Sequence, residues 1–79
     1  MKILLFAQAK EIAGCDHVRL DIDRAISVDE LWDALVAAFD GLAPLRRSSR
    51  IARNGQYATS GTRLEPTDEI AVIPPVSGG

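Results

Sequence analysis

The sequence contains very few of the residues that build disulfides and metal centres. Its 79 residues include one cysteine, Cys15, and one histidine, His17. One cysteine cannot form a disulfide within the chain, and one cysteine with one histidine cannot supply a Cys/His metal cluster. We therefore expect a domain that is stabilised by its hydrophobic core and binds no metal.

The sequence also lacks a basic excess and any long apolar stretch. Nine basic and eleven acidic residues give a net charge of −2. Nucleic-acid-binding domains are typically basic, so no nucleic-acid partner is expected. No apolar run approaches the roughly 20 residues of a membrane span, and the residues after Lys2 do not resemble a secretion signal. These features predict a cytoplasmic protein with no membrane contact.

The composition indicates one folded domain: 47% of the residues are apolar and 25% are charged. A chain of this length forms a single core. We expect residues 1–75 to form the domain and residues 76–79 to form a flexible C-terminal tail.

The first third of the chain predicts a hairpin. Residues 2–7 are aliphatic without alternation, which is typical of a strand covered on both faces. Residues 17–22 alternate, so Val18, Leu20 and Ile22 should face the core. Between these strands, residues 9–13 are expected to form one helical turn that ends at Gly14.

One main helix is predicted to begin at Ser27. Ser27 and Glu30 have the spacing of a capping box, in which each side chain accepts a hydrogen bond from the other residue's backbone N–H. Gly41 is expected to end the helix, with Pro44 preventing its continuation. Trp32 should be half-buried beside an apolar stripe formed by Val28, Leu31, Leu35 and Phe39.

The second half predicts three short strands. Asn54-Gly55 is the typical pair for a two-residue hairpin turn between residues 51–53 and 56–58. Residues 70–73 form the last apolar strand. The order of elements predicts an α+β fold with one main helix across one face of a mixed sheet. If the first and last strands lie side by side and parallel, this is the β-grasp, or ubiquitin-like, fold.

The last six residues are the strongest functional candidate. Pro74 and Pro75 cannot continue a sheet ladder and favour an extended stalk. Val76 and Ser77 extend the stalk. Gly78 and Gly79 have no side chains, so they can enter a narrow channel in another protein and present the α-carboxylate of Gly79.

Two other groups of residues have weaker functional interpretations. Cys15 and His17 lie two positions apart but are more simply a loop thiol and a surface imidazole. Arg46, Arg47, Arg50 and Arg53 form either a docking patch or a solvated surface. We expect no independent catalytic site.

With this tail, the sequence resembles the family of small sulfur-carrier subunits of molybdopterin synthase. The resemblance covers essentially the whole chain. It is carried by residues 2–7, the helix start at Ser27, Leu64 with residues 68–70, and above all Pro-Pro-Val-Ser-Gly-Gly at residues 74–79.

The resemblance implies a carrier that reacts within other enzymes. An adenylyltransferase related to ubiquitin-activating enzymes would use ATP to join AMP to Gly79. A sulfur donor enzyme would then displace AMP, leaving a C-terminal thiocarboxylate (1-thioglycine). This sulfur would be transferred to the cyclic pterin precursor of the molybdenum cofactor. The catalytic groups would belong to the partner, and the carrier would bind no cofactor of its own.

The resemblance also implies a partner-binding surface. The large catalytic subunit of molybdopterin synthase would contact Phe6, Tyr57, Ile73 and the tail residues 74–77, within a heterotetramer. Tyr57 stands where an aliphatic residue is typical of the family. Phe6 and Ile73 are equally compatible with the protein core on pattern alone.

Three alternatives have different chemistry or partners. The chain could carry sulfur for thiazole, tRNA or cysteine synthesis. It could be a ubiquitin-like modifier that is conjugated to lysines through Gly79. It could also be an interaction domain with an inert tail that works through residues 46–53.

Overall fold

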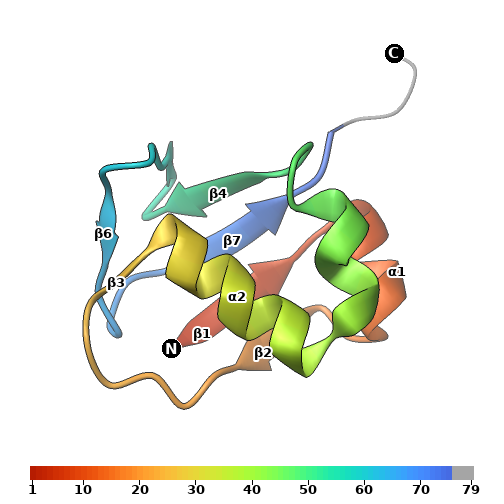
Figure 1. Cartoon of the computed structure of the whole chain (residues 1–79), viewed down its shortest axis with the longest axis horizontal. Helices are drawn as coiled ribbons and strands as arrows, with labels where there is room; N and C mark the ends of the chain where they lie inside the picture. Colours follow the sequence, from red (N-terminus) through yellow and green to blue (C-terminus); the bar gives the residue numbers. More distant parts are fainter. Residues whose placement is uncertain (76–79) are drawn as a thin grey trace.

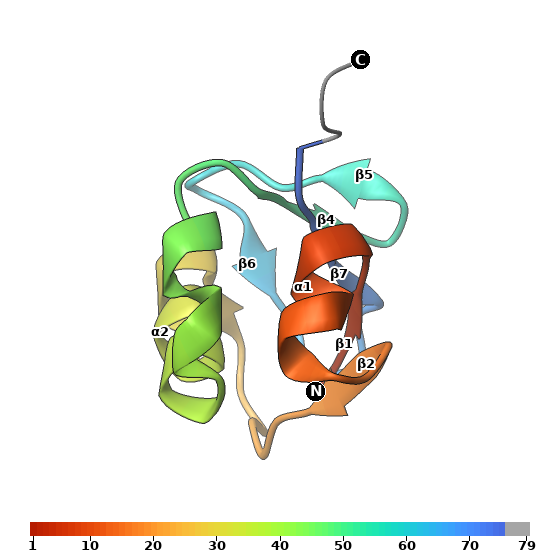
Figure 2. The same cartoon turned by 90° about the vertical axis from the view of Figure 1, so that its right-hand side faces the viewer.

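A five-stranded mixed sheet and one main helix form the two layers of the molecule (Figures 1 and 2). The computed structural model describes residues 1–75. The sheet has the order β2-β1-β7-β4-β5. Its strands are β1 (Lys2–Leu5), β2 (His17–Arg19), β4 (Arg50–Arg53), β5 (Gln56–Tyr57) and β7 (Ile70–Ile73).

The first and last strands lie side by side at the centre of this sheet. β1 and β7 are parallel, with Ile3 opposite Ile70. β2 is antiparallel to β1, and β4 is antiparallel to β7, with Ile51 opposite Val72. This arrangement confirms the predicted β-grasp fold.

Helix α2 (Val28–Ala38) covers one face of the sheet and begins as predicted. The Glu30 backbone N–H donates to Ser27 Oγ at 3.1 Å, and the Ser27 N–H donates to Glu30 Oε1 at 2.9 Å. The hydrogen bond from the Ser27 N–H lowers the pKa of the Glu30 carboxyl. Leu31 and Leu35 are fully buried on the inner face of the helix.

The predicted end of this helix is wrong in detail. α2 ends at Ala38, and a 3-10 helix, η1 (Asp40–Leu45), follows and includes both Gly41 and Pro44. A Cβ at Gly41 would lie 2.9 Å from Ile12 Cγ2 of helix α1, so the exposed Ile12 side chain would have to shift. This glycine therefore lets η1 pack closely on α1 and does not terminate α2.

The first strand is shorter than predicted and the first helix is longer. β1 ends at Leu5, and α1 covers Ala7–Ala13. Ala7 has a φ of +49°, which turns the chain sharply out of the sheet. Gly14 ends α1 in the left-handed conformation, with a φ of +76°, as predicted.

A second, two-stranded sheet was not predicted. β3 (Ile26–Ser27) pairs with β6 (Arg63–Leu64), with Ile26 opposite Leu64. Two-residue strands have no detectable alternation, so they are set by tertiary pairing. Trp32 is 3% exposed and not half-buried, because β4 and the segment around Ala58 lie beside its side chain.

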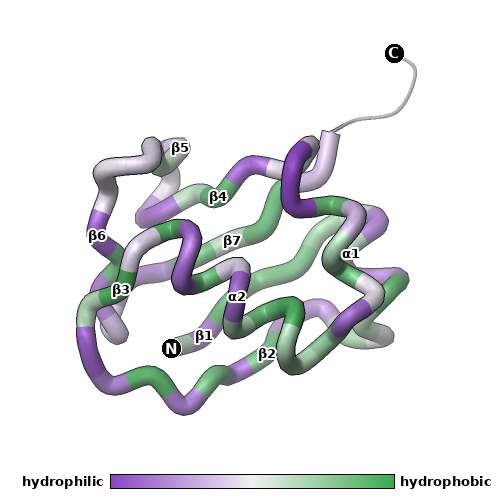
Figure 3. The backbone as a smooth tube through the Cα atoms, in the orientation of Figure 1, coloured by the Kyte–Doolittle hydropathy of each residue, from purple (hydrophilic) through white to green (hydrophobic). Residues whose placement is uncertain are grey.

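Hydrophobic residues are concentrated along the central strands and the inner side of α2 (Figure 3). Val18 is buried, whereas Leu20 and Ile22 pack against the core while remaining partly exposed. Within residues 1–75, no helix combines the length and apolar character needed to cross a membrane.

Candidate functional site

The candidate tail leaves the body from the middle of the sheet. Ile73, the last residue of β7, lies opposite Arg50 of β4, and it is followed by buried Pro74 and exposed Pro75. The preceding residue, Val72, also pairs with Leu5 of β1. Because β7 has a neighbour on both sides, the point of departure is fixed relative to the whole sheet. The predicted tail residues Val76, Ser77, Gly78 and Gly79 lie outside the described residues.

The structure brings together the three predicted contact residues of the body. Phe6, Tyr57 and Ile73 line one groove of about 390 Å³ on the face of the sheet opposite α2. Phe6 is 48% exposed and Tyr57 is 57% exposed, whereas Ile73 is partly buried. Phe6 is therefore a surface residue, and the alternative that it belongs to the protein core is excluded.

Ala52 and Ala71 form the floor of this groove. They lie opposite each other on β4 and β7, and each is 8% exposed. On the other side of β4, Tyr57 of β5 lies opposite Ala52. Two small side chains beside a large one leave a depression, and apolar depressions with aromatic margins are typical of protein interfaces. These alanines could not be identified from the sequence, because neither has a distinctive local pattern.

Tyr57 is positioned by a tight hairpin and by an arginine. Asn54 and Gly55 have φ values of +51° and +83°, which confirms the predicted turn between β4 and β5. The Arg50 guanidinium carbon lies 4.5 Å from the centre of the Tyr57 ring. This cation–π contact holds the Tyr57 ring at the margin of the groove that Ile73, the last strand residue before the candidate tail, also lines.

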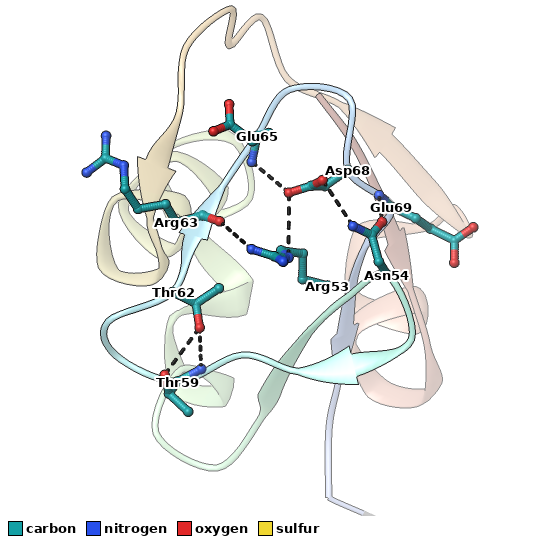
Figure 4. Close-up of polar contacts among 8 residues, drawn as sticks. All are labelled: Arg53, Asn54, Thr59, Thr62, Arg63, Glu65, Asp68 and Glu69. Carbon is teal, nitrogen blue, oxygen red and sulfur yellow. Dashed lines mark hydrogen bonds and ion pairs between the residues drawn. The ribbon is translucent and has the colours of Figure 1, made fainter.

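A polar network fixes this hairpin to the turn before β7 (Figure 4). Asp68 Oδ1 accepts a hydrogen bond from Asn54 Nδ2 at 3.0 Å, and Asp68 Oδ2 accepts one from the Glu65 backbone N–H at 2.8 Å. The Glu69 N–H donates to Asn54 Oδ1 at 2.8 Å, and the Asn54 N–H donates to the Glu69 carbonyl. Asn54 and Asp68 therefore hold together the two strands that carry the floor of the groove.

The hydrogen bonds of this network stabilise the charged form of the Asp68 carboxylate. Its side chain is 14% exposed, and Arg53 Nε lies 3.8 Å from Oδ2. The hydrogen bond from the Glu65 N–H, followed by the one from Asn54, lowers the pKa of Asp68. In the sequence this aspartate stands out only among the residues that carry the family resemblance, because its partner Asn54 lies fourteen positions away.

The predicted arginine cluster makes several different contacts. Arg46 donates to Asp33 Oδ1 at 2.9 Å, and this hydrogen bond raises the pKa of Arg46. Arg53 donates to the Arg63 carbonyl at 3.0 Å, and Arg50 stacks on Tyr57. Arg46 and Arg50 also line one hollow between α2 and β4. The interpretation of residues 46–53 as a docking patch stays a prediction.

Cys15 and His17 do not form a catalytic pair. The Cys15 thiol is partly buried, and its Sγ lies 3.8 Å from the Ala13 carbonyl oxygen. His17 Nδ1 lies 2.8 Å from Asp16 Oδ1 on the surface, and this hydrogen bond lowers the pKa of Asp16. Among residues 1–75, no group of three or more acidic, histidine or cysteine side chains is arranged to hold a metal ion.

Comparisons with known proteins agree with this geometry. Residues 3–79 match the ThiS family. The chain is 35% identical over 79 residues to a molybdopterin synthase sulfur carrier subunit of Arabidopsis thaliana, covering all of this chain and 82% of the relative. It is 35% identical over 82 residues to the human protein of the same name, covering all of this chain and 93% of the relative.

An archaeal protein is similarly related. Small archaeal modifier protein 1 of Haloferax volcanii is 38% identical over 87 residues, with complete coverage of both chains. A crystal structure of that protein, SAMP1, superposes with a TM-score of 0.84 at 36% identity, covering 99% of this chain and 97% of that one. The family match and these full-length similarities lead to one conclusion: the chain is a β-grasp protein that belongs to the ThiS family.

Proposed function

We propose that this protein is the sulfur carrier subunit of a molybdopterin synthase. The observation that carries the proposal is its full-length similarity, at 35% identity, to proteins of that name from a plant and from humans. The geometry supports it, because the strand that leads to the tail ends beside an exposed apolar groove.

The tail would be the reacting part. In the proposed cycle an adenylyltransferase joins AMP from ATP to the Gly79 carboxylate and releases pyrophosphate, which activates a poor electrophile. A sulfur donor enzyme displaces AMP and leaves the C-terminal thiocarboxylate, 1-thioglycine. Residues 74–79 then enter the large catalytic subunit, where the terminal sulfur is transferred to the cyclic pterin precursor. We place this cycle in the cytoplasm and assign the groups that activate the precursor to the large subunit.

The body would deliver the tail in a defined direction. Phe6, Tyr57 and Ile73 would contact the large subunit through the groove. Docking on a face rigidly connected to β7 would restrict the positions that Gly79 can reach, and such restriction lowers the entropic cost of productive encounters. The proposed division is therefore a folded body, residues 1–75, that positions a reactive tail, residues 76–79.

The test is sulfur loading and transfer by the full-length chain. Incubation with the adenylyltransferase, ATP and the sulfur donor should exchange one oxygen for sulfur at the C-terminus, detected by mass spectrometry. Deletion of Gly79 should abolish loading and conversion of the pterin precursor, whereas Glu11→Gln, in an exposed position on α1, should preserve both. Precursor conversion by the Gly79-deleted chain would contradict the proposal.

A second candidate is a protein modifier joined to lysines through Gly79. The similarity to small archaeal modifier protein 1 favours it. This candidate predicts that the chain, expressed in its own cells, is recovered in isopeptide conjugates that carry Gly79 on lysine side chains. A carrier without modifier activity would yield the thiocarboxylate and no such conjugates.

A further inference from the structure

Basic residues lie beside the groove, although the whole chain has a net charge of −2 and the one charged residue that lines the groove in the described part of the chain is Glu69. A second hollow shares Leu4 and Phe6 with the groove, and Lys2 and Lys10 line it. On β2, the exposed residue Arg19 lies opposite Lys2. The open face of the sheet, defined as the face opposite α2, thus collects cationic side chains around an apolar centre.

Acidic residues at this face are fewer. Glu69 lines the groove, and Asp16 lines the second hollow. Asp16 lies 2.8 Å from the His17 imidazole nitrogen. The remaining acidic residues include Asp29 and Asp33 of α2, which pair with Arg46 away from the groove. The open face is therefore more positive than the rest of the molecule.

Arg50 is the cation best placed to select a partner. It lies opposite Ile73, the last strand residue before the candidate tail, and its guanidinium stacks on Tyr57 at 4.5 Å. The Arg46 and Arg53 side chains donate hydrogen bonds to protein groups, whereas the Arg50 side chain has no hydrogen bond or ion pair with other residues in the 1–75 region. Stacking on an aromatic ring fixes a guanidinium while leaving its N–H groups available at the ring edge.

An apolar hollow beside a fixed arginine matches one kind of surface. A hydrophobic side chain of a protein partner can fill the space above Ala52 and Ala71, and a neighbouring carboxylate can pair with Arg50. A nucleic acid is a poorer match, because the groove floor is apolar and the chain as a whole is acidic.

We infer that the open face binds an acidic surface of a protein partner, with a protruding apolar side chain over Ala52 and Ala71 and a carboxylate on Arg50. The inference rests on the proposed function, which makes the large subunit of molybdopterin synthase that partner. It adds the chemistry of the contact and identifies Arg50 as a residue that determines specificity. Opposite charges across an interface accelerate encounter and disfavour wrong partners.

The test is binding of the full-length chain to the purified large subunit of the same organism, measured by calorimetry and by association kinetics at several salt concentrations. Arg50→Glu should raise Kd about tenfold or more, mainly by slowing association, and should weaken its salt dependence. Arg50→Lys keeps the charge but loses the planar stack that fixes it, so its Kd should lie between those of wild type and Arg50→Glu. Thermal unfolding of each variant checks that it is folded.

Arg24→Glu is the matched control, because it makes the same change of charge in the loop before β3. Arg24 is exposed and lies 3.7 Å from Glu30 of α2. This variant should bind within about twofold of wild type, since an exposed pair contributes little. Equal losses for Arg50→Glu and Arg24→Glu would overturn the inference while leaving the proposed function intact.

Three further outcomes distinguish the hypotheses. A wild-type chain that does not bind the large subunit would overturn the proposed function and this inference together. Tight binding of a single-stranded oligonucleotide that is lost in Arg50→Glu would assign the face to a nucleic acid and overturn the inference alone. Retained precursor conversion with a raised Kd in Arg50→Glu would support it.

Discussion

The two faces of the central sheet are built from the same strands but have opposite character. On β7, Ile70 and Val72 are fully buried under α2, whereas Ala71 and Ile73 point to the open face. On β1, Ile3 and Leu5 are buried, while Lys2 and Leu4 line the hollows. The covered face is filled with large aliphatic side chains, and the open face combines small, aromatic and basic ones.

This difference shows how a chain of 79 residues can separate stability from recognition. Alternation along a strand sends neighbouring residues to opposite faces, so each strand contributes to both. The covered face removes apolar area from water and stabilises the fold. The open face retains exposed Phe6 and Tyr57, which contribute little to stability within residues 1–75 and are available to a partner.

The largest expected effect on stability lies on the covered face. Leu35→Ala, in the centre of α2, should lower the free energy of unfolding by about 3 kcal/mol, because it leaves a cavity in the core. Urea denaturation measures this change. Ile73→Ala on the open face should cost less than about 1 kcal/mol. Similar losses for both variants would break the distinction between the faces.

A smaller effect is expected at the network that joins the two strands of the groove floor. Asp68→Ala should lower the free energy of unfolding by about 2 kcal/mol, because it removes the charged acceptor of the Asn54 and Glu65 hydrogen bonds. Glu65→Ala is the control, since the network uses only the Glu65 backbone. Equal stability of wild type and Asp68→Ala would show that the groove is held by strand pairing alone.

This effect should depend on pH. The lowered pKa of Asp68 means that its charged form is favoured in the folded protein, so its contribution is fully present above its unfolded pKa of about 4. The contribution should disappear as the pH falls through the lower, folded pKa. Urea denaturation at a series of pH values should therefore show the gap between wild type and Asp68→Ala closing in acid. A constant gap would contradict the role of the charge.

The smallest effect on stability is expected at the exposed aromatic of the open face. Tyr57→Ala should change the free energy of unfolding by no more than about 0.5 kcal/mol, because the side chain is 57% exposed. Its Kd for the large subunit should rise about tenfold, as expected for an aromatic anchor of an interface. Tyr57→Phe keeps the ring under Arg50 and should bind normally. A strongly destabilised Tyr57→Ala variant that binds normally would reverse the assignment of the two faces.

Much of the fold could be predicted because its signals are local. The capping box at Ser27, the Asn54-Gly55 turn and the left-handed Gly14 each depend on residues that are neighbours in the chain. The second sheet and the burial of Trp32 could not be predicted, because they depend on pairing between distant segments. The role of Gly41 was misinterpreted for the same reason: the side chain that lies close to it belongs to Ile12, twenty-nine positions earlier in the sequence.

The candidate site was partly predictable. Phe6, Tyr57 and Ile73 were expected from the family resemblance, and the structure places them in one groove. The assignment of a role to Gly79 remains a prediction. The floor of the groove and the role of Asp68 were missed, since an alanine in a strand and an aspartate in a turn have many ordinary explanations.

Short patterns and recognisable motifs were enough to predict the local conformations, the α+β class and the resemblance that points to a reactive tail. The packing of the strands, by contrast, decided that Ala52 and Ala71 meet to form a hollow. Tertiary packing also decided that Asp33 pairs with Arg46 while Arg50 stacks on Tyr57 beside the tail base. The physical reason is register: cross-strand pairing joins residues far apart in the chain, and their shape and charge become a binding surface only where those strands meet.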